Sequence, residues 1–411
     1  MSVSPLTVSR PRLGRVRIVT AVTVIAVLSL SIEACGGPGS ASTAIGPPTT
    51  SAPATAAATA TATATATRGY RSAITDRVVD DPRFDPLQGQ IETRLKAAKL
   101  DGAALLVLQR GRLVEQEGFG TYGIDERVPI ASASKWLTGA TIMSVVDDGL
   151  LDLDAPISRY LPATRGAAAR ITTRQLVSFT SGLPNDERIS CFADRTVSLA
   201  ACNAQILAMP LVARPGAQFR YSGTHLHVAA GVVEAVTGQP FEQVFQERVA
   251  GPLGMTSTTF LRPDEEAAGS HPQPAGGARS TLGDYGRFLE MLGHEGVAPD
   301  GSRVLDQASV VEMSKDQTGG APVVQATEER RAADTRYGVA HWLDVIGPDG
   351  RATLESSPGK FGFLPWIDRT NGVAGVYLVV DRREGAAKTP RTSGDLVRTG
   401  VAHALGVVLP H

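Results

Sequence analysis

Two strand-like segments at opposite ends of the globular part of this chain constrain its fold more than any other feature. Residues 103–123 alternate like two antiparallel strands joined by an Arg-Gly turn, and residues 372–383 read as a valine-rich strand. Helical patterns cover residues 86–100 and 393–405 and dominate the stretch between the strands. We therefore expect an α+β fold, in which helices flank an antiparallel sheet built from both chain ends and a mainly helical region is inserted.

The inserted region contains clear helix boundaries. Apolar residues fill every side of residues 136–146, which is typical of a buried helix, and Gly149 follows as a carboxy-terminal cap. A second helix is expected to begin near Asp154, with Pro156 in its first turn. A third is expected between Ser222 and Gly238.

The first 35 residues have the pattern of an export signal. Four arginines precede an uncharged apolar run at residues 18–32, which is too short to span a bilayer comfortably. The run ends in Ile-Glu-Ala-Cys, which resembles the lipobox of bacterial lipoproteins and makes Cys35 the expected lipidated residue. A plain signal peptide, or one anchor helix with an incidental cysteine, is the alternative interpretation.

Residues 36–69 are rich in alanine, threonine and proline. The stretch has no apolar periodicity, so it cannot bury enough surface to offset the entropy of ordering and is expected to be a flexible stalk. The predicted organisation is a signal at 1–35, a stalk at 36–69 and a folded domain at 70–411. It predicts an exported protein held by a lipid anchor at the outer face of a membrane, or otherwise a secreted one.

Charge and cysteine content exclude some classes of partner. The chain has a net charge of −1, and removal of residues 1–34, which carry +3, leaves −4, so nucleic acid is a poor partner. Cys191 and Cys202 are close in sequence and, in an oxidising compartment, predict a disulfide, with two separate buried thiols as the alternative. Neither they nor the histidines match a zinc motif, and no cofactor is implied.

The segment IASASKWLTG, residues 130–139, suggests chemistry. Ser132 and Lys135 have the spacing that places two side chains on one face of a helical turn. Burial and the positive helix end both disfavour the ammonium form, so the amine could accept the serine proton. An ordinary helix cap is the alternative. Residues 357–360 also match SxxK, but Pro358 and Gly359 oppose a helix there.

Further motifs follow in a familiar order. Tyr221 stands just before a helical pattern, residues 176–183 read LVSFTSGL, and residues 275–292 form a glycine turn leading into a helix. Together with Ser132 and Lys135, they resemble the serine β-lactamase and penicillin-binding-protein family, in the branch of class C β-lactamases, D,D-peptidases and related esterases. The resemblance runs from about Ala103 to the final helix.

The resemblance implies roles for individual residues. Ser132 would be the nucleophile and Lys135 its base. Tyr221 stands where the YxN motif has its tyrosine and would act as a general acid or base, with a core tyrosine as the alternative. The amides of Ser132 and Lys360 would bind the oxyanion.

Two family motifs depart from their usual residues. Gly223 stands where YxN has asparagine, and Ser357, Pro358 and Gly359 stand where the strand motif has lysine or histidine, threonine and glycine. The usual strand residues hold a substrate carboxylate, through a charged hydrogen bond of about 1.5–3 kcal/mol. Lactam and D-Ala-peptide substrates are therefore less expected than esters.

The leading hypothesis is an exported serine hydrolase that forms an acyl-enzyme on Ser132 with an ester, amide or lactam substrate. Its partners would be a small-molecule or cell-wall-peptide substrate and a membrane. The alternative is a catalytically weak protein that binds a ligand at the cell envelope. An α/β-hydrolase is excluded because the chain has no GxSxG elbow.

Overall fold

The structure is a computed structural model, and it describes residue 70 and residues 72–185, 189–192, 194, 197–261, 272–327, 335–380 and 388–410. All of them belong to one compact unit, which spans residues 64–411. The predicted signal, Cys35 and the predicted stalk lie outside the described residues, so the boundaries at 35 and 69 stay predictions. Among the described helices, none combines the length and hydropathy needed to cross a bilayer.

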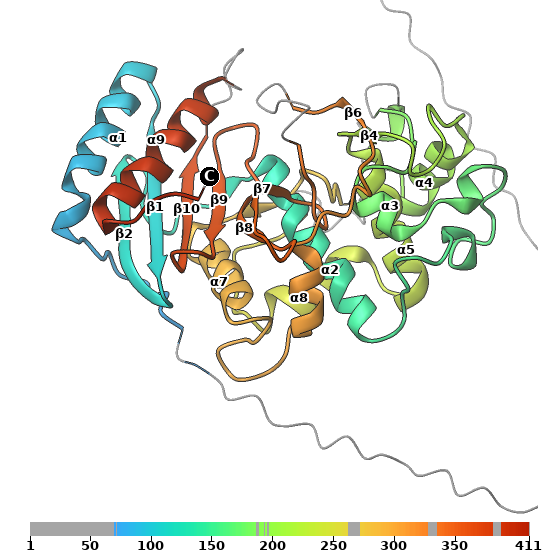
Figure 1. The fold of residues 1–411 in the computed structure, drawn as a ribbon, viewed down its shortest axis with the longest axis horizontal. Coiled ribbons are helices and arrows are strands. Elements are labelled where there is room, and N and C mark those ends of the chain that lie inside the picture. Colours follow the sequence, from blue (N-terminus) through green and yellow to red (C-terminus); the bar gives the residue numbers. More distant parts are fainter. Residues whose placement is uncertain are drawn as a thin grey trace, which may run out of the picture. The chain divides into compact units, whose positions relative to one another are not determined.

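A six-stranded sheet forms the centre of this unit (Figure 1). Its order is β2-β1-β10-β9-β8-β7, and each neighbouring pair is antiparallel. The strands are β1 (Gly102–Gln109), β2 (Arg112–Gly120), β7 (Trp342–Ile346), β8 (Ala352–Ser356), β9 (Leu364–Asp368) and β10 (Val373–Val379). Strand β1 lies between β2, its hairpin partner, and β10, the last strand of the chain, which confirms the predicted sheet from both chain ends.

Alternation along β1 explains why both faces of the sheet are covered. Leu106 and Leu108 join the core on one face, whereas Leu105 and Val107 join the core on the other. Successive side chains of a strand point to opposite faces, so an apolar run such as this one needs two covering layers. Helices from the two ends of the chain provide one layer, and the inserted region provides the other.

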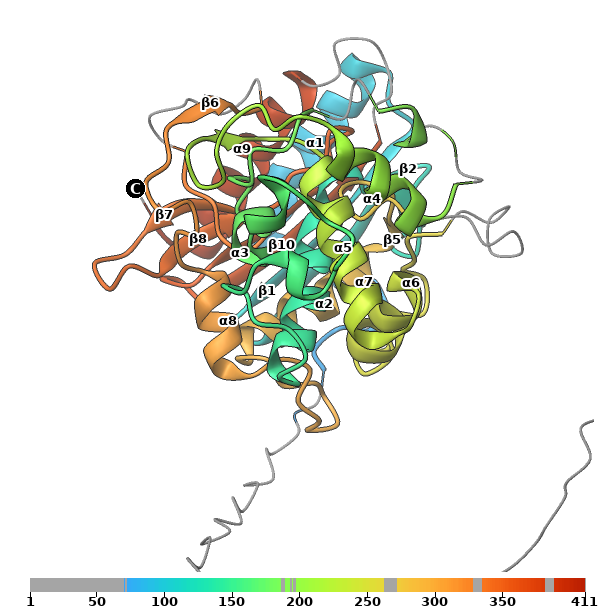
Figure 2. The same cartoon turned by 90° about the vertical axis from the view of Figure 1, so that its right-hand side faces the viewer.

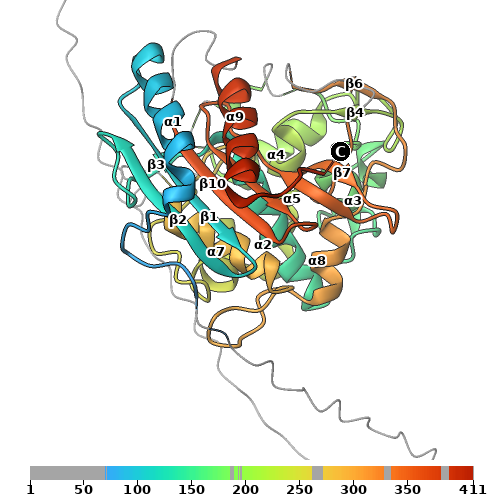
Figure 3. The same ribbon diagram turned by 60° about the vertical axis from the view of Figure 1, so that its left-hand side comes forward.

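Helices α1 (Asp85–Ala98) and α9 (Lys388–Leu405) pack together over one face, as Figure 3 shows. Helix α7 (Leu282–Gly293) packs on β1, β9 and β10 from the other face, where α2 (Ser134–Asp147) and α8 (Gln307–Met313) also lie. The final helix begins at 388, five residues earlier than its sequence pattern predicted.

The inserted helical region packs around α2 and faces the viewer in Figure 2. It contains α3 (Thr173–Val177), α4 (Leu199–Ala208), α5 (Thr224–Thr237) and α6 (Phe241–Phe245). Two small sheets tie it together, an antiparallel pair of β3 (Val128–Pro129) with β5 (Arg279–Ser280) and a parallel pair of β4 (Phe219–Arg220) with β6 (Val323–Gln325).

The helix expected from Asp154 is not formed. A 3-10 turn at Ile157–Arg159 stands there, with Pro156 before it rather than inside a helical turn. A second proline at 162 leaves too few residues for a longer helix, and the Asp152 amide donates to the Tyr160 hydroxyl at 2.9 Å. The prediction was wrong because it used the first proline and ignored the second.

Residues 72–80, here called the amino-terminal strap, fasten the start of the domain to α7 and β2. The buried carboxylate of Glu290 accepts hydrogen bonds from the Ser72 hydroxyl at 2.6 Å and the Ala73 amide at 2.7 Å. Further along, Val79 forms a β-bridge with Gln116. The strap is therefore an integral part of the fold, with contacts on two different elements.

Candidate active site

Ser132 lies in a 3-10 turn, Ala131–Ala133, that leads directly into α2. Ala131 before it has a left-handed backbone, with φ of 45°, which a residue with a side chain rarely adopts without support from its surroundings. That support comes from Ser134, whose hydroxyl donates to Ala131 O at 2.6 Å and accepts from the Ala278 amide at 3.0 Å. Ser132 itself is partly exposed. The turn therefore presents the serine at the surface of a rigid support.

Lys135 lies beside Ser132, in the first turn of α2. Its Nζ is 3.0 Å from Ser132 Oγ and donates to Ala275 O at 2.5 Å. The lysine is 4% exposed, and no carboxylate of the described residues pairs with it. The amine is thus held by one hydroxyl and one carbonyl. The sequence spacing foresaw the first of these contacts but not the second.

Tyr221 completes the group from a distant part of the chain. Lys135 Nζ lies 4.8 Å from the centroid of its ring. The ring stacks on Trp342, with centroids 5.2 Å apart, and meets Phe179 edge-on at 5.3 Å. These contacts fix the ring but leave the residue partly exposed. The structure therefore brings the predicted serine, lysine and tyrosine together.

The carbonyl that faces Lys135 is carried by a tight turn. Gln273 O accepts from the amides of Gly276 at 3.0 Å and Gly277 at 2.7 Å, and the Thr138 hydroxyl of α2 donates to Pro274 O at 2.7 Å. Ala275 is therefore fixed against the first turns of α2. Sequence reasoning missed its role because a backbone carbonyl leaves no residue signature; the neighbouring glycine pair was the only signal.

Residues 357–360 approach Ser132 from the sheet side. The Ser357 hydroxyl donates to Ser132 O at 3.2 Å. Gly359 is so close that a Cβ at this residue would lie 2.2 Å from Ile130 O. Glycine is required here because a backbone approach this close has no room for a side chain.

The Lys360 amide is placed by the same loop. The amides of Ser357 and Gly359 donate to β9-side carbonyls, those of Pro365 at 3.3 Å and Phe363 at 2.7 Å. Pro358 has no amide hydrogen, and the amide that follows Gly359 in the loop is that of Lys360, which stands at a turn. Neither it nor the Ser132 amide donates to an acceptor in the described part of the chain. The Lys360 side chain is exposed.

Gly223 lies at the start of α5 and offers no side-chain amide to the site. The first turn of α5 contributes His225, a fully buried ring between the Ser181 hydroxyl at 2.8 Å and Arg220 O at 2.9 Å. Burial lowers the pKa of His225 to about 4, so the ring is neutral and donates to Arg220 O. It stacks on Phe179, with centroids 4.9 Å apart, and so supports the same ring that contacts Tyr221.

Cys191 and Cys202 form a disulfide. It joins a short 3-10 turn, Ser190–Phe192, to α4. Phe192 O accepts a hydrogen bond from Gln273 Nε2 at 2.7 Å. The disulfide loop is therefore connected to the turn that presents Ala275 O to Lys135.

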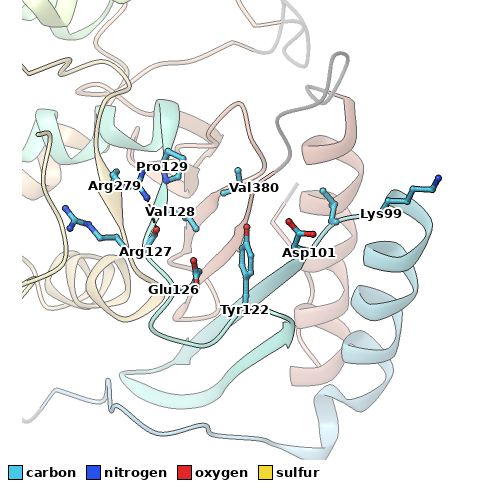
Figure 4. A pocket seen from close by; sticks show the side chains of 10 residues that line it. Lys99, Asp101, Tyr122, Glu126, Arg127, Val128, Pro129, Arg279 and Val380 are labelled. Atoms are coloured by element: carbon cyan, nitrogen blue, oxygen red, sulfur yellow. Dashed lines mark hydrogen bonds between the residues drawn. The ribbon is translucent and has the colours of Figure 1, made fainter. Parts of the chain in front are cut away.

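A pocket of 530 Å³ lies where β3 and β5 approach the ends of β1 and β10 (Figure 4). In Figure 4 the Tyr122 ring stands between Glu126 and Asp101. Val128 and Pro129 line this pocket, but Ser132, Lys135 and Tyr221 do not. It is thus separate from the reacting groups. Across the described residues, no group of three or more metal-binding side chains is placed to hold a metal ion.

Comparisons with known proteins point to one family. A family model described as Beta-lactamase matches residues 87–396. Protein Rv1367c of Mycobacterium tuberculosis is 31% identical over 348 residues, which cover 69% of this chain and 84% of that protein.

Solved structures share the fold. A protein of Bacteroides dorei, provisionally named a beta-lactamase, superimposes with a TM-score of 0.68 at 31% identity and covers 77% of this chain and 98% of its own. A family VIII carboxylesterase superimposes with a TM-score of 0.65 at 16% identity, covering 80% and 99%, which shows likeness of fold alone.

Proposed function

The chain belongs to the beta-lactamase family of serine hydrolases, and from this premise we propose that it is an exported esterase that acts through an acyl-enzyme on Ser132. One observation carries the proposal. Lys135 Nζ lies 3.0 Å from Ser132 Oγ while Ala275 O and the Tyr221 ring fix its direction. In the proposed reaction Lys135, held by its hydrogen bond to Ala275 O, takes the hydroxyl proton of Ser132.

Acylation would begin with attack of Ser132 Oγ on the substrate carbonyl carbon. The serine proton passes to Lys135, and the carbonyl oxygen becomes an oxyanion that accepts hydrogen bonds from the amides of Ser132 and Lys360. Collapse breaks the bond to the leaving group, which takes a proton from Tyr221 or Lys135. Water then hydrolyses the acyl-enzyme and restores the Ser132 hydroxyl.

The loop at 357–360 favours esters without a carboxylate beside the scissile bond. Ser357 directs its hydroxyl to the backbone of Ser132, and Pro358 has no hydrogen-bonding side chain. Neither supplies a cation, so a substrate carboxylate would lose a charged hydrogen bond of about 1.5–3 kcal/mol, close to tenfold or more in affinity. Small neutral esters do not need that contact.

We also propose that the domain works at the outer face of a membrane. The support is the arginine-rich apolar run before Cys35 and the stalk-like residues that follow it. Radioactive palmitate fed to producing cells should label the wild-type chain and leave Cys35→Ala unlabelled. Release of both chains into the medium without label would contradict the anchor.

The test of activity uses the purified full chain and a fluorophosphonate probe, with Ser132→Ala as control. We expect one adduct, mapped to Ser132 by peptide mass analysis, and faster turnover of p-nitrophenyl butyrate than of nitrocefin. A folded wild-type chain with no adduct would instead support the ligand-binding alternative, for which the missing asparagine and strand cation would be the reason.

A further inference from the structure

His341 occupies a buried turn between α2 and the sheet. A Cβ on Gly139 of α2 would lie 2.6 Å from Val339 O, so the turn reaches the helix only because glycine stands there. The His341 ring is fully buried and stacks on Trp136 of α2, with centroids 4.6 Å apart and planes inclined by 13°. The ring is therefore fixed against the helix that carries Lys135.

Both nitrogens of the ring face acceptors. Nδ1 lies 3.1 Å from Val339 O, and Nε2 lies 2.9 Å from Glu355 Oε2. Burial opposes ionisation of Glu355, but the charge of Arg369 and the hydrogen bond from His341 outweigh it and lower its pKa to about 2. A carbonyl and a carboxylate have no hydrogen to donate, so the ring satisfies both only with a proton on each nitrogen.

The surrounding charges suit an imidazolium. Glu355 on β8 also binds Arg369, with Nη2 at 2.6 Å from Oε1. Arg369 lies 3.9 Å from Glu295, which pairs with Arg351 at 3.1 Å. From α2 the ring meets the uncharged indole of Trp136, whose face attracts a cation. The fully buried carboxylate of Glu355 thus lies between the Arg369 guanidinium and the His341 ring.

Trp136 and Glu355, which both contact the His341 ring, are close in sequence to the reacting groups. Trp136 follows Lys135 in sequence. Glu355 stands two residues before Ser357, whose hydroxyl donates to Ser132 O at 3.2 Å. One buried ring therefore links α2, which carries Lys135, to β8, which leads into the loop that carries the Lys360 amide.

We propose that His341, in its imidazolium form, is a positioning residue that fixes β8 against α2 and so sets the distance between Ser132 and the Lys360 amide. This inference rests on the proposed hydrolase function. His341 does not touch the substrate; it acts through Trp136 and Glu355. Loss of its second proton removes one of its two donors and loosens one side of the contact.

The test combines a variant with a spectroscopic signature. His341→Gln keeps a donor for Glu355 but no charge and no aromatic ring, and His294→Gln, which removes a ring stacked on Tyr70, is the matched control. With p-nitrophenyl butyrate, His341→Gln should lower kcat about 10- to 100-fold with KM within threefold. The control should keep both constants.

The ionisation of His341 is followed by nitrogen-15 NMR of the full chain labelled at histidine, with the signals assigned by the variant. At neutral pH both ring nitrogens should give N–H signals. Above the pH at which one of the two N–H signals disappears, the kcat of the wild-type chain should fall. The kcat of His341→Gln should not fall over the same pH range. If the variant does not fold, the wild-type comparison of NMR and kcat decides alone.

Three results would overturn the inference. A neutral ring at neutral pH, a folded His341→Gln with kcat within twofold of wild type, or a wild-type kcat that ignores the loss of the proton would each do so while leaving the hydrolase function intact. A wild-type chain that forms no acyl-enzyme would overturn the function and this inference together.

Discussion

Gly359→Ala tests whether the loop after β8 belongs to the catalytic machinery. A Cβ at this residue would lie 2.2 Å from Ile130 O, and real Cβ atoms keep at least 3.0 Å. The loop and the segment before Ser132 must therefore separate by about 0.8 Å. The loop at Gly359 and the Ile130 carbonyl are both parts of the backbone, so no flexible side chain can absorb the shift.

The displaced segment carries the Lys360 amide, and this determines the expected loss. A misplacement of about 1 Å in a catalytic geometry costs about 100-fold in rate, and overpacking of this kind destabilises a protein by about 1–3 kcal/mol. We expect kcat/KM for p-nitrophenyl butyrate to fall about 100-fold in a chain that still folds. Stopped-flow kinetics and thermal unfolding measure the two effects separately.

Gly89→Ala is the matched control, because a Cβ on Gly89 meets nothing within 4 Å. Gly89 lies in α1, so alanine should stabilise the helix by up to about 1 kcal/mol and leave kcat/KM unchanged. If Gly359→Ala lowers the unfolding temperature yet keeps the wild-type kcat/KM, the loop does not supply the oxyanion donor and the reasoning fails.

Three further outcomes are expected. Lys135→Met should slow fluorophosphonate labelling of Ser132 about 10²–10⁴-fold without unfolding the chain, and labelling at the wild-type rate would show that another base serves the serine. Replacing both Cys191 and Cys202, 11 residues apart, by alanine should cost about 3 kcal/mol in thermal unfolding, whereas a variant that unfolds like the wild type would assign the disulfide no stabilising role. Burial raises the pKa of Glu115 to about 7, so the stability that this carboxyl contributes is complete below about pH 4.5 and lost as the pH rises through 7. The free energy of unfolding of Glu115→Gln should therefore rise relative to wild type by on the order of 2 kcal/mol between pH 4.5 and 8. A difference that stays constant with pH would contradict the raised pKa.

Short-range patterns made much of the fold and site predictable. The period-two pattern of residues 103–123 specified the hairpin, and the i, i+3 spacing of Ser132 and Lys135 specified their contact. Tyr221 could be placed only through a family resemblance, because nothing local shows that a residue about ninety positions away returns to the lysine.

Other parts depend on contacts that a sequence does not display. Ala275 acts through a carbonyl, which every residue has. The buried pair of His341 and Glu355 comes from two segments that meet only when the sheet forms, and neither residue has a motif around it. The catalytic roles themselves stay predictions until the variants are measured.

The amino-terminal strap determines how the domain bears mechanical load. A pull on the chain before residue 70 first meets Tyr70, whose amide donates to Pro299 O at 3.0 Å and whose ring stacks on His294. It then reaches Glu290 of α7, through two short hydrogen bonds, and Gln116 of β2. Glu290 lies in a helix that packs on the sheet and Gln116 lies in the edge strand of the sheet, and none of these contacts involves the turn that holds Ser132. If the proposed anchor holds the chain at a membrane, a pull on it would therefore detach these contacts before the force reached Ser132.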